Sequence, residues 1–194
     1  MASDPVAADL DLDAVRAALA DRRPSTGGVT SAVGWQAATA LVVAPGPQAL
    51  EIALIERAER PGDRWSGQMA LPGGKRDSED DDLADTAIRE TREEVGLQLG
   101  PPLARLDDQR GRARPGVVAT YVFTLEHRPP LVPQAAEVAA AFWAPIPALF
   151  DPAATTRFRW SGIPFPAIEH EGRVIWGLTH RILQTFADAV GLSR

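Results

Sequence analysis

The hydrophobic pattern of the first hundred residues predicts a helix followed by a pair of strands. Residues 36–44 (QAATALVVA) and 50–57 (LEIALIER) are runs of apolar and β-branched side chains, and the turn-forming sequence PGPQ separates them. Runs of this kind between turn residues are typical of strands, so we expect a β-hairpin. A short helix that ends near Pro24 is expected before them, because several apolar residues lie near helical spacing: Leu10, Val15, Ala18 and Leu19.

An irregular segment and then a second helix follow the hairpin. Residues 60–82 are rich in Gly, Pro and Asp, which predicts a loop without regular structure. The apolar spacing of residues 83–95 predicts an amphipathic helix that Gly96 can end. We expect its buried stripe to contain the residues that recur at steps of three and four: Leu83, Ala87, Ile88, Thr91 and Val95.

The second half of the chain predicts more strands and a C-terminal helix. Residues 103–109, 117–126 and 138–146 are rich in apolar or β-branched residues between Pro and Gly breaks, which is typical of strands. Residues 147–150 can form a helical turn, and residues 165–177 predict two short strands around a Glu-Gly turn. The helix is expected over residues 178–192, with one stripe formed by Leu178, Ile182, Leu183, Phe186 and Val190.

The composition predicts one principal domain. The 194 residues are 45% hydrophobic, which is enough for a sizeable core. No internal repeat or second domain boundary is visible, and residues 25–34 (STGGVTSAVG) predict a flexible connector. We therefore divide the chain into an N-terminal helix with its connector, residues 1–30, and a principal domain, residues 31–194.

The charge and the missing residue types exclude several classes of protein. A formal net charge of -6 argues against a nucleic-acid partner, because a general nucleic-acid binder needs a basic surface. Without cysteine the chain has no disulfide, thiolate zinc site or thiol nucleophile. The acidic N-terminus is unlike a signal peptide, and no apolar run reaches the roughly 18 residues of a membrane span. We expect a cytoplasmic protein with no membrane partner.

The candidate chemistry lies at the end of the predicted helix over residues 83–95. Glu90, Glu93 and Glu94 would be neighbours on its surface, where each like-charge pair costs roughly 0.2–0.5 kcal/mol. The helix dipole adds about 0.3–1 kcal/mol against anions in the last turn. A hard divalent cation such as Mg²⁺ prefers oxygen ligands and would reverse both effects. The alternative is a solvated helix face on which Arg89 pairs with Glu93.

The sequence around these glutamates resembles the signature of a known enzyme family. Upstream, Gly73 and Gly74 let the backbone pass closely and can offer a carbonyl to a metal. Residues 73–97 (GGKRDSEDDDLADTAIRETREEVGL) resemble the Nudix hydrolase signature: a glycine, an acid, Arg-Glu, an apolar position, Glu-Glu, and a closing glycine with an apolar residue. The resemblance implies the α/β class, as a Nudix-type α/β/α sandwich with a mixed β-sheet.

The same resemblance implies roles for the residues of the signature. Glu90 and Glu94 would be the main ligands of Mg²⁺ or Mn²⁺, and Glu93 would be a further ligand or a base. Gly74 would offer a carbonyl ligand, and Arg89 would orient the glutamates.

Three departures from the commonest signature affect the loop and the helix. The interval from Gly74 to Arg89 is one residue longer than the commonest spacing, and Thr91 fills the apolar position. The acid before the helix is Asp80 or Asp81 rather than Glu, which leaves the roles of these two residues open.

The longer interval resembles the coenzyme A pyrophosphatase branch of the family. Residues 66–74 (SGQMALPGG) are similar to a pattern of that branch, with Leu71 in place of Phe, and residues 53–58 and 174–183 are similar to two others. The branch's second arginine is displaced here by one position, to Arg64, and Trp65 stands where a histidine is usual. The substrate-binding candidates are Arg57, Arg64 and Gln68.

The arginines of this region also have a simpler interpretation. Arg57, Arg60 and Arg64 can be loop surface charges, whereas together, before the metal loop, they can contact phosphates.

Glu137 is a candidate ligand or base outside the helix, in a segment that resembles the family's late acidic loop. The alternative is a solvent-exposed residue at the start of a strand. Trp143, Trp160 and Trp176 are expected to be core or rim aromatics rather than platforms for a base. The histidines lack metal-ligand spacing, and no G-x-S-x-G, Walker A or dinucleotide-binding motif is present.

The resemblance implies metal-dependent hydrolysis of a pyrophosphate bond in a nucleoside diphosphate linked to another group. Coenzyme A or a derivative is the preferred substrate, with ADP-ribose, dinucleotides and damaged nucleotides as alternatives. A non-catalytic nucleotide-binding module of the same fold is a further alternative, which loss of a glutamate of the signature would favour. None is lost here. The expected partner is a small nucleotide-type molecule, and the protein is expected to be a monomer or homodimer.

Overall fold

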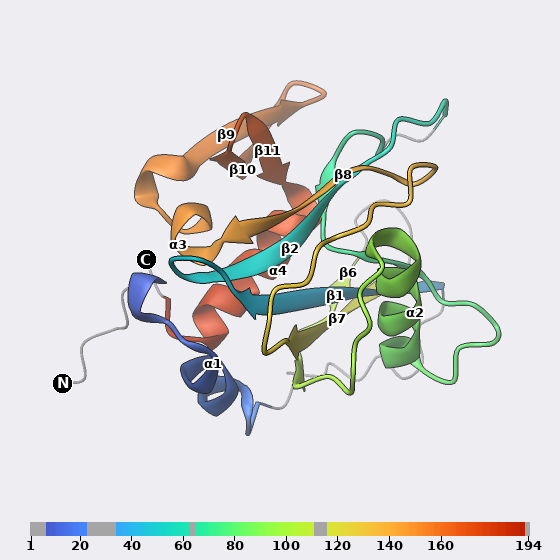
Figure 1. The fold of residues 1–194 in the computed structure, drawn as a ribbon. Coiled ribbons are helices and arrows are strands. Elements are labelled where there is room, and N and C mark those ends of the chain that lie inside the picture. The colour runs from blue at the N-terminus through green and yellow to red at the C-terminus, as the bar shows by residue number, and fades with distance from the viewer. Residues whose placement is uncertain (1–6, 23–33, 63–64, 111–115, 193–194) are drawn as a thin grey trace.

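The computed structural model describes residues 7–22, 34–62, 65–110 and 116–192 (Figure 1). The helices are α1 (Leu12–Leu19), α2 (Leu83–Val95), α3 (Ile146–Leu149) and α4 (Gly177–Ala189), with 3-10 turns at Ala7–Asp9 and Pro152–Ala154. The strands of the main sheet are β1 (Trp35–Pro45), β2 (Leu50–Arg57), β3 (Met69–Ala70), β4 (Gly73–Lys75), β5 (Ala104–Arg105), β6 (Gln109–Arg110), β7 (Gly116–Thr124) and β8 (Val138–Pro145). A second sheet contains β9 (Thr155–Trp160), β10 (Ile163–His170) and β11 (Arg173–Trp176).

The main sheet is mixed, and β1 lies at its centre. β1 pairs antiparallel with β2, as the predicted hairpin requires, and parallel with β7. The parallel pair is possible because the chain between β1 and β7 is long and crosses over through α2. β8 pairs antiparallel with β2, so the segment that carries Glu137 joins the sheet beside the strand that ends at Arg57.

Helices cover both faces of this sheet, which confirms the α/β/α layers. Side chains alternate along a strand, so Ala40 and Val42 pack on the α2 side while Leu41 and Val43 pack on the other side. That other side is covered by α1, α3 and α4 (Figure 1). Burial on both faces explains why β1 is a nearly continuous apolar run instead of an alternating one.

The N-terminal helix contributes to the same core. Val15 and Leu19 of α1 are fully buried and pack in the cluster that contains Leu41 of β1. Asp11 caps the helix by accepting a hydrogen bond from the backbone N–H of Ala14 at 2.7 Å. The predicted connector over residues 25–34 lies, except for Gly34, outside the described residues. No helix in the described part of the chain is long and apolar enough to cross a membrane.

Several elements differ from the sequence predictions. The segment 60–82 contains β3 and β4, which are formed because neighbouring strands offer backbone partners: Ala70 pairs with Ile55, and Gly74 pairs with Ala38. The predicted strand 103–109 is two short strands, since Arg105 forms an ion pair with Asp108 where the chain turns.

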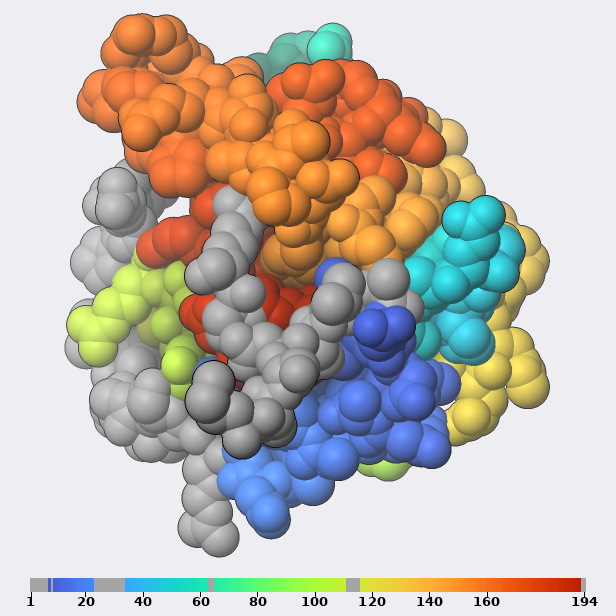
Figure 2. Space-filling model, turned by 90° about the vertical axis from the view of Figure 1, so that its left-hand side faces the viewer, coloured from blue at the N-terminus to red at the C-terminus, as the bar shows by residue number. Residues whose placement is uncertain are grey.

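The strand β9 was not predicted. It alternates exposed and half-buried side chains, and arginines fill two exposed positions, so its apolar content is low. It pairs antiparallel with β10, which pairs with β11 as predicted around the Glu171-Gly172 turn. In Figure 2 the orange region that includes β9 stands out from the body of the molecule.

Candidate metal and catalytic site

The helix that carries the glutamates begins and ends where the sequence predicts. Asp82 accepts hydrogen bonds from the N–H groups of Ala84 and Asp85, which starts α2. Gly96 adopts a left-handed conformation at φ 74° and donates its N–H to the carbonyl of Arg92, which ends it. The helix packs against β1 and β4, so its inner face meets the Gly73–Gly74 backbone.

Glu90 and Glu93 converge on one nitrogen of Arg89, whereas Glu94 turns into the protein, so the three glutamates do not form a single patch. Glu94 is buried, with 3% of its surface exposed, whereas the Glu93 side chain is 51% exposed. Residues four apart on a helix differ in direction by only about 40°, so Glu90 and Glu94 share a side, but consecutive residues differ by about 100°. Glu93 therefore points away from Glu94 and pairs with Arg89 at 3.1 Å.

Glu94 faces the first residue of β4. Its Oε2 accepts a hydrogen bond from the N–H of Gly73 at 2.8 Å. Burial raises the pKa of this carboxyl to about 7, and the charges of Glu90 and Glu137 act in the same direction. The Gly73 hydrogen bond and the charge of Arg57 oppose the rise.

The Glu90 carboxylate occupies space that only a glycine leaves open. A Cβ atom on Gly74 would lie 2.5 Å from both oxygens of Glu90, which is too close for any real contact. Burial raises the pKa of Glu90, while its hydrogen bond with Arg89 lowers it. The carboxylates of Glu90 and Glu94 thus lie against successive glycines of β4, Gly74 and Gly73.

Glu137 reaches this site from a distant segment. Its N–H donates to the carbonyl of Gln134, and the Gln134 N–H donates to the carbonyl of Glu94, both at 2.9 Å. On its other side the Glu137 carbonyl accepts from Ala58, directly after β2, at 2.8 Å. Its negative charge raises the pKa of both Glu90 and Glu94. The backbone therefore fixes Glu137 near the two helix carboxylates.

Arg60 holds the Glu137 segment from the side. Its guanidinium donates to the Ala136 carbonyl from Nε at 3.1 Å and from Nη2 at 2.7 Å, and Nη2 also contacts Glu137 at 2.9 Å. The sequence grouped Arg60 with the arginines that can contact phosphates, and nothing in its spacing indicated this contact with Glu137.

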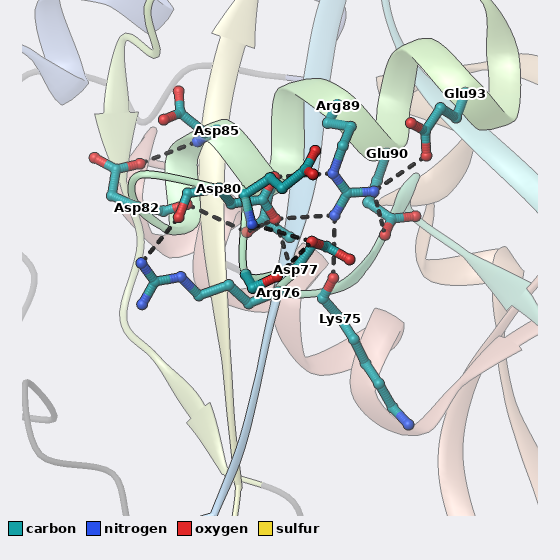
Figure 3. Close-up of polar contacts among 12 residues, drawn as sticks. Lys75, Arg76, Asp77, Asp80, Asp82, Asp85, Arg89, Glu90 and Glu93 are labelled. Atoms are coloured by element: carbon teal, nitrogen blue, oxygen red, sulfur yellow. Dashed lines mark hydrogen bonds and ion pairs between the residues drawn. The ribbon is translucent and has the colours of Figure 1, made fainter.

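Arg89 is the centre of a polar network below the helix (Figure 3). Its Nη1 contacts Glu90 at 3.0 Å and Glu93 at 3.1 Å. Its other side meets both oxygens of Asp80 at 2.9 Å, and Nη2 reaches the carbonyl of Lys75 at 3.2 Å. The pair of Arg89 with the exposed Glu93 matches the alternative interpretation of the helix face, whereas the Glu90 side chain is only 15% exposed.

Asp80, in the loop before α2, is the acid that contacts Arg89 of the helix. Its side chain is 4% exposed and accepts further hydrogen bonds from the Thr86 hydroxyl at 2.8 Å and the Asp77 N–H at 2.9 Å. The hydrogen bonds from Arg89 hold the pKa of Asp80 well below its ordinary value. Asp81 is exposed. Thus Asp80, of the two acids that the sequence left open, lies in the network.

The donors of this site fit a hard divalent cation that also takes ligands from a substrate. Every donor atom is an oxygen, which Mg²⁺ prefers. Glu90 and Glu94, whose pKa values are raised, lie against neighbouring glycines of β4. Within the described ranges, no group of three or more His, Asp or Glu side chains stands ready to hold a metal ion. A Mg²⁺ site with one or two carboxylates and substrate phosphates needs no such group.

The predicted substrate-binding residues lie at the end of β2 and before β3. The N–H of Arg57 donates to the carbonyl of Gln68 at 3.0 Å, so the two residues face each other across a turn. Nε2 of Gln68 is buried and has no hydrogen-bond partner among the described residues. Arg64 lies outside the described residues.

Comparisons with known proteins identify the family to which this chain belongs. The model of the NUDIX domain family matches residues 35–164. An uncharacterized Nudix hydrolase of Yersinia enterocolitica, NudL, is 30% identical over 141 residues, which cover 66% of this chain and 69% of that protein. An uncharacterized protein of Schizosaccharomyces pombe is 39% identical over 117 residues, 56% of this chain but only 36% of that protein's own length.

One solved structure is a further match. It is the NUDIX domain of Shewanella oneidensis NrtR complexed with ADP ribose. It is 21% identical, with a TM-score of 0.49, and the match covers 63% of this chain and 79% of that one.

Proposed function

Because this chain belongs to the Nudix hydrolase family, we propose that it hydrolyses the pyrophosphate bond of a nucleoside diphosphate linked to another group. Coenzyme A or a derivative is the preferred substrate, cleaved to 3',5'-ADP and 4'-phosphopantetheine. The substrate proposal is supported by the resemblance of residues 53–58, 66–74 and 174–183 to the coenzyme A pyrophosphatase branch.

The observation that carries the proposal is that the carboxylates of Glu90 and Glu94 lie against the successive glycines Gly74 and Gly73 of β4, with the charge of Glu137 close enough to raise the pKa of both. Two of these carboxylates lie at the end of a helix, and burial raises the pKa of both. Such an arrangement is unfavourable for the protein alone, and a divalent cation makes it favourable. Glu90 and Glu94, with the carbonyl of Gly74, would hold Mg²⁺ or Mn²⁺. Glu93 would join them only after releasing Arg89.

The residues around the ion would bind and orient the substrate. The ion supplies positive charge that stabilises the diphosphate as the bond breaks. Arg57, Arg64 and Gln68 would contact the substrate from the segment between β2 and β3. Glu137 would accept the proton of the attacking water, and Arg60 would keep its carboxylate in place. Arg89 would orient Glu90.

A substrate panel tests the proposal. Purified protein with Mg²⁺ is incubated with coenzyme A, ADP-ribose, NADH, diadenosine polyphosphates and nucleoside triphosphates, and products are identified by mass spectrometry. Release of 4'-phosphopantetheine as the fastest reaction is the expected result. Faster cleavage of ADP-ribose or a dinucleotide would replace coenzyme A as the substrate, and hydrolysis of none would favour a binding module.

Replacing Gly74 with alanine is expected to weaken Mn²⁺ binding roughly tenfold or more while the protein stays folded. The new Cβ would displace the Glu90 carboxylate, whose side chain can move without disturbing the backbone. Titration calorimetry measures the affinity. The control is Gly100→Ala, because a Cβ on Gly100 meets nothing within 4 Å. Equal Mn²⁺ affinities for both variants and the wild type would remove Glu90 from the site.

Mn²⁺ binding is expected to depend on pH below neutrality. The pKa of Glu94 is raised to about 7, so at lower pH the ion has to displace its proton. The affinity should rise by up to about tenfold per pH unit below pH 7 and level off above it. Calorimetry in buffers of different ionisation enthalpy counts the released protons. An affinity that stays constant from acid to neutral pH would contradict Glu94 as a ligand.

A further inference from the structure

Aromatic side chains gather on the second sheet, on the side of the segment between β2 and β3. Trp176, at the end of β11, lies at their centre and is 8% exposed. Its ring centroid is 4.6 Å from that of Phe158, 5.2 Å from Trp160 and 5.5 Å from Phe165. These three outer rings are only half-buried. Trp176 therefore supports a layer of rings that partly face solvent.

Trp65 extends this layer toward the candidate site. Its ring is nearly parallel to that of Trp160, with an interplanar angle of 9° and centroids 6.3 Å apart. Trp65 remains 48% exposed, although large aromatic side chains are usually buried. We call Trp65, Phe158, Trp160 and Phe165 the aromatic ledge. Contiguous exposed apolar patches on a protein surface often mark binding sites.

Hydrogen bonds of Arg60 connect the neighbour of Trp65 to the segment that carries Glu137. The hydroxyl of Ser66, next to Trp65, accepts from the Arg60 N–H at 2.9 Å and donates to the Arg60 carbonyl at 3.1 Å. The guanidinium of Arg60 in turn contacts Ala136 and Glu137. Ser66, directly after Trp65, is thus linked through Arg60 to Glu137, the acid expected to work on the diphosphate.

Gln68 adds a polar group beside Trp65. Its backbone N–H donates to the Trp65 carbonyl at 3.4 Å, so both residues belong to the same turn. The buried Nε2 of Gln68 has no hydrogen-bond partner in the described part of the chain. A buried donor of this kind is usually satisfied. Because this atom is closed to solvent, the Gln68 side chain has to turn outward before its amide can donate to a ring nitrogen or carbonyl of a bound base.

We propose that the aromatic ledge stacks the nucleobase of the substrate, while the amide of Gln68 donates a hydrogen bond to that base. For Trp160 this proposal replaces the sequence expectation, which gave it no part in stacking a base. The proposal rests on the proposed function for the position of the diphosphate near Glu90, Glu94 and Glu137. Flat aromatic rings suit a planar heteroaromatic group, and the attached phosphates would extend toward the carboxylates.

A second copy of the chain fits the aromatic ledge less well. The second sheet has two edge strands, β9 and β11, each paired with β10 alone among the described strands, and β9 is the edge that carries two rings of the ledge. Arg157 and Arg159 are exposed on β9, and charged side chains on an edge strand oppose pairing with another strand.

The test compares AMP with ribose 5-phosphate, which differ only in the base. With Mg²⁺ present, calorimetry is expected to show that the wild type binds AMP roughly fivefold or more tightly than ribose 5-phosphate. Trp65→Ala should remove this preference, and Trp65→Phe should keep most of it. The control is Ile163→Ala, which removes another exposed apolar side chain, 59% exposed, from the same sheet and should leave the preference unchanged.

Each other outcome overturns a separate part of the account. If the panel substrates are hydrolysed but Trp65→Ala keeps the wild-type preference for AMP, the ledge proposal is wrong and the proposed function stands. If nothing is hydrolysed but the preference depends on Trp65, the ledge stands and the proposed function falls. A wild-type dimer that Trp65→Ala dissociates in sedimentation, with no preference for AMP, would show that a second copy covers the ledge.

Discussion

Glu94→Gln is expected to lower kcat by about a thousandfold, the scale on which a metal ion stabilises transition-state charge. The amide has the shape of the carboxyl and keeps an oxygen for the Gly73 N–H, so the fold should not change. What it loses is the negative charge that would bind the ion. Steady-state kinetics at saturating Mg²⁺ on the best substrate of the panel measures the effect.

The matched control is Asp85→Asn, which removes one charge from an exposed position of the same helix and should leave kcat within a factor of two or so of the wild type. Near-normal metal-dependent turnover in Glu94→Gln would remove Glu94 from the metal site. A loss of equal size in the control would assign the effect to general charge on α2.

Glu94→Gln is also expected to change the stability of the metal-free protein. The folded pKa of Glu94 is raised, so its contribution to stability is present below its ordinary pKa and is lost as the pH rises through about 7. The raised pKa of Glu94 corresponds to a loss of roughly 3 kcal/mol at most in the free energy of unfolding at pH 8. Metal-free Glu94→Gln should therefore unfold at a higher urea concentration than the wild type at pH 8, even though it is inactive.

Asp80→Asn is expected to reduce the free energy of unfolding by about 3 kcal/mol at pH 7. The Asp80 carboxylate is buried against the Arg89 guanidinium, and its removal leaves a partly buried charge with one fewer partner. Activity should fall as well, because Arg89 also contacts Glu90. Urea unfolding followed by fluorescence measures the stability.

The control and the pH dependence separate this effect from a general loss of charge. Asp81→Asn, at the exposed neighbouring acid, should change the stability by less than about 0.5 kcal/mol. The folded pKa of Asp80 is lowered, so its contribution exists above the ordinary pKa and is lost as the pH falls. The wild type and Asp80→Asn should therefore converge in acid. Equal stability at pH 7 would contradict the structural role of the Asp80–Arg89 pair.

The elements that could be predicted from the sequence are those with a strong local signal. The helix α2 has a capping aspartate, an apolar stripe and a closing glycine, and the structure begins and ends it at the predicted residues. β1 and β2 are apolar runs around a turn, and they pair as a hairpin. In each case local propensity and the tertiary fold favour the same structure.

Elements that depend on a partner could not be predicted in this way. The strand β9 alternates arginines with half-buried residues, so only its pairing with β10 makes it a strand. The short strands β3 and β4 exist because β2 and β1 offer free backbone groups. Their own sequence is dominated by turn residues.

The candidate site also combines features that local spacing predicts with features that depend on the tertiary fold. Spacing placed Glu90 and Glu94 on one side of the helix, but it could not show that Glu94 points into the protein while Glu93 points out. Which of Asp80 and Asp81 meets Arg89 depends on the path of the loop. The contact of Arg60 with Glu137 joins residues far apart in the chain, and no local pattern carries that information.

The central claim is that a divalent cation sits between Glu90 and Glu94 and brings a pyrophosphate to its hydrolysis. A crystal grown with Mn²⁺ and a non-hydrolysable nucleotide analogue, measured at a wavelength where manganese scatters anomalously, tests it most directly. We expect an anomalous peak in contact with Glu90, Glu94 and an oxygen of the diphosphate. No peak there, with Glu90 still bound to Arg89 and the analogue elsewhere, would contradict the account.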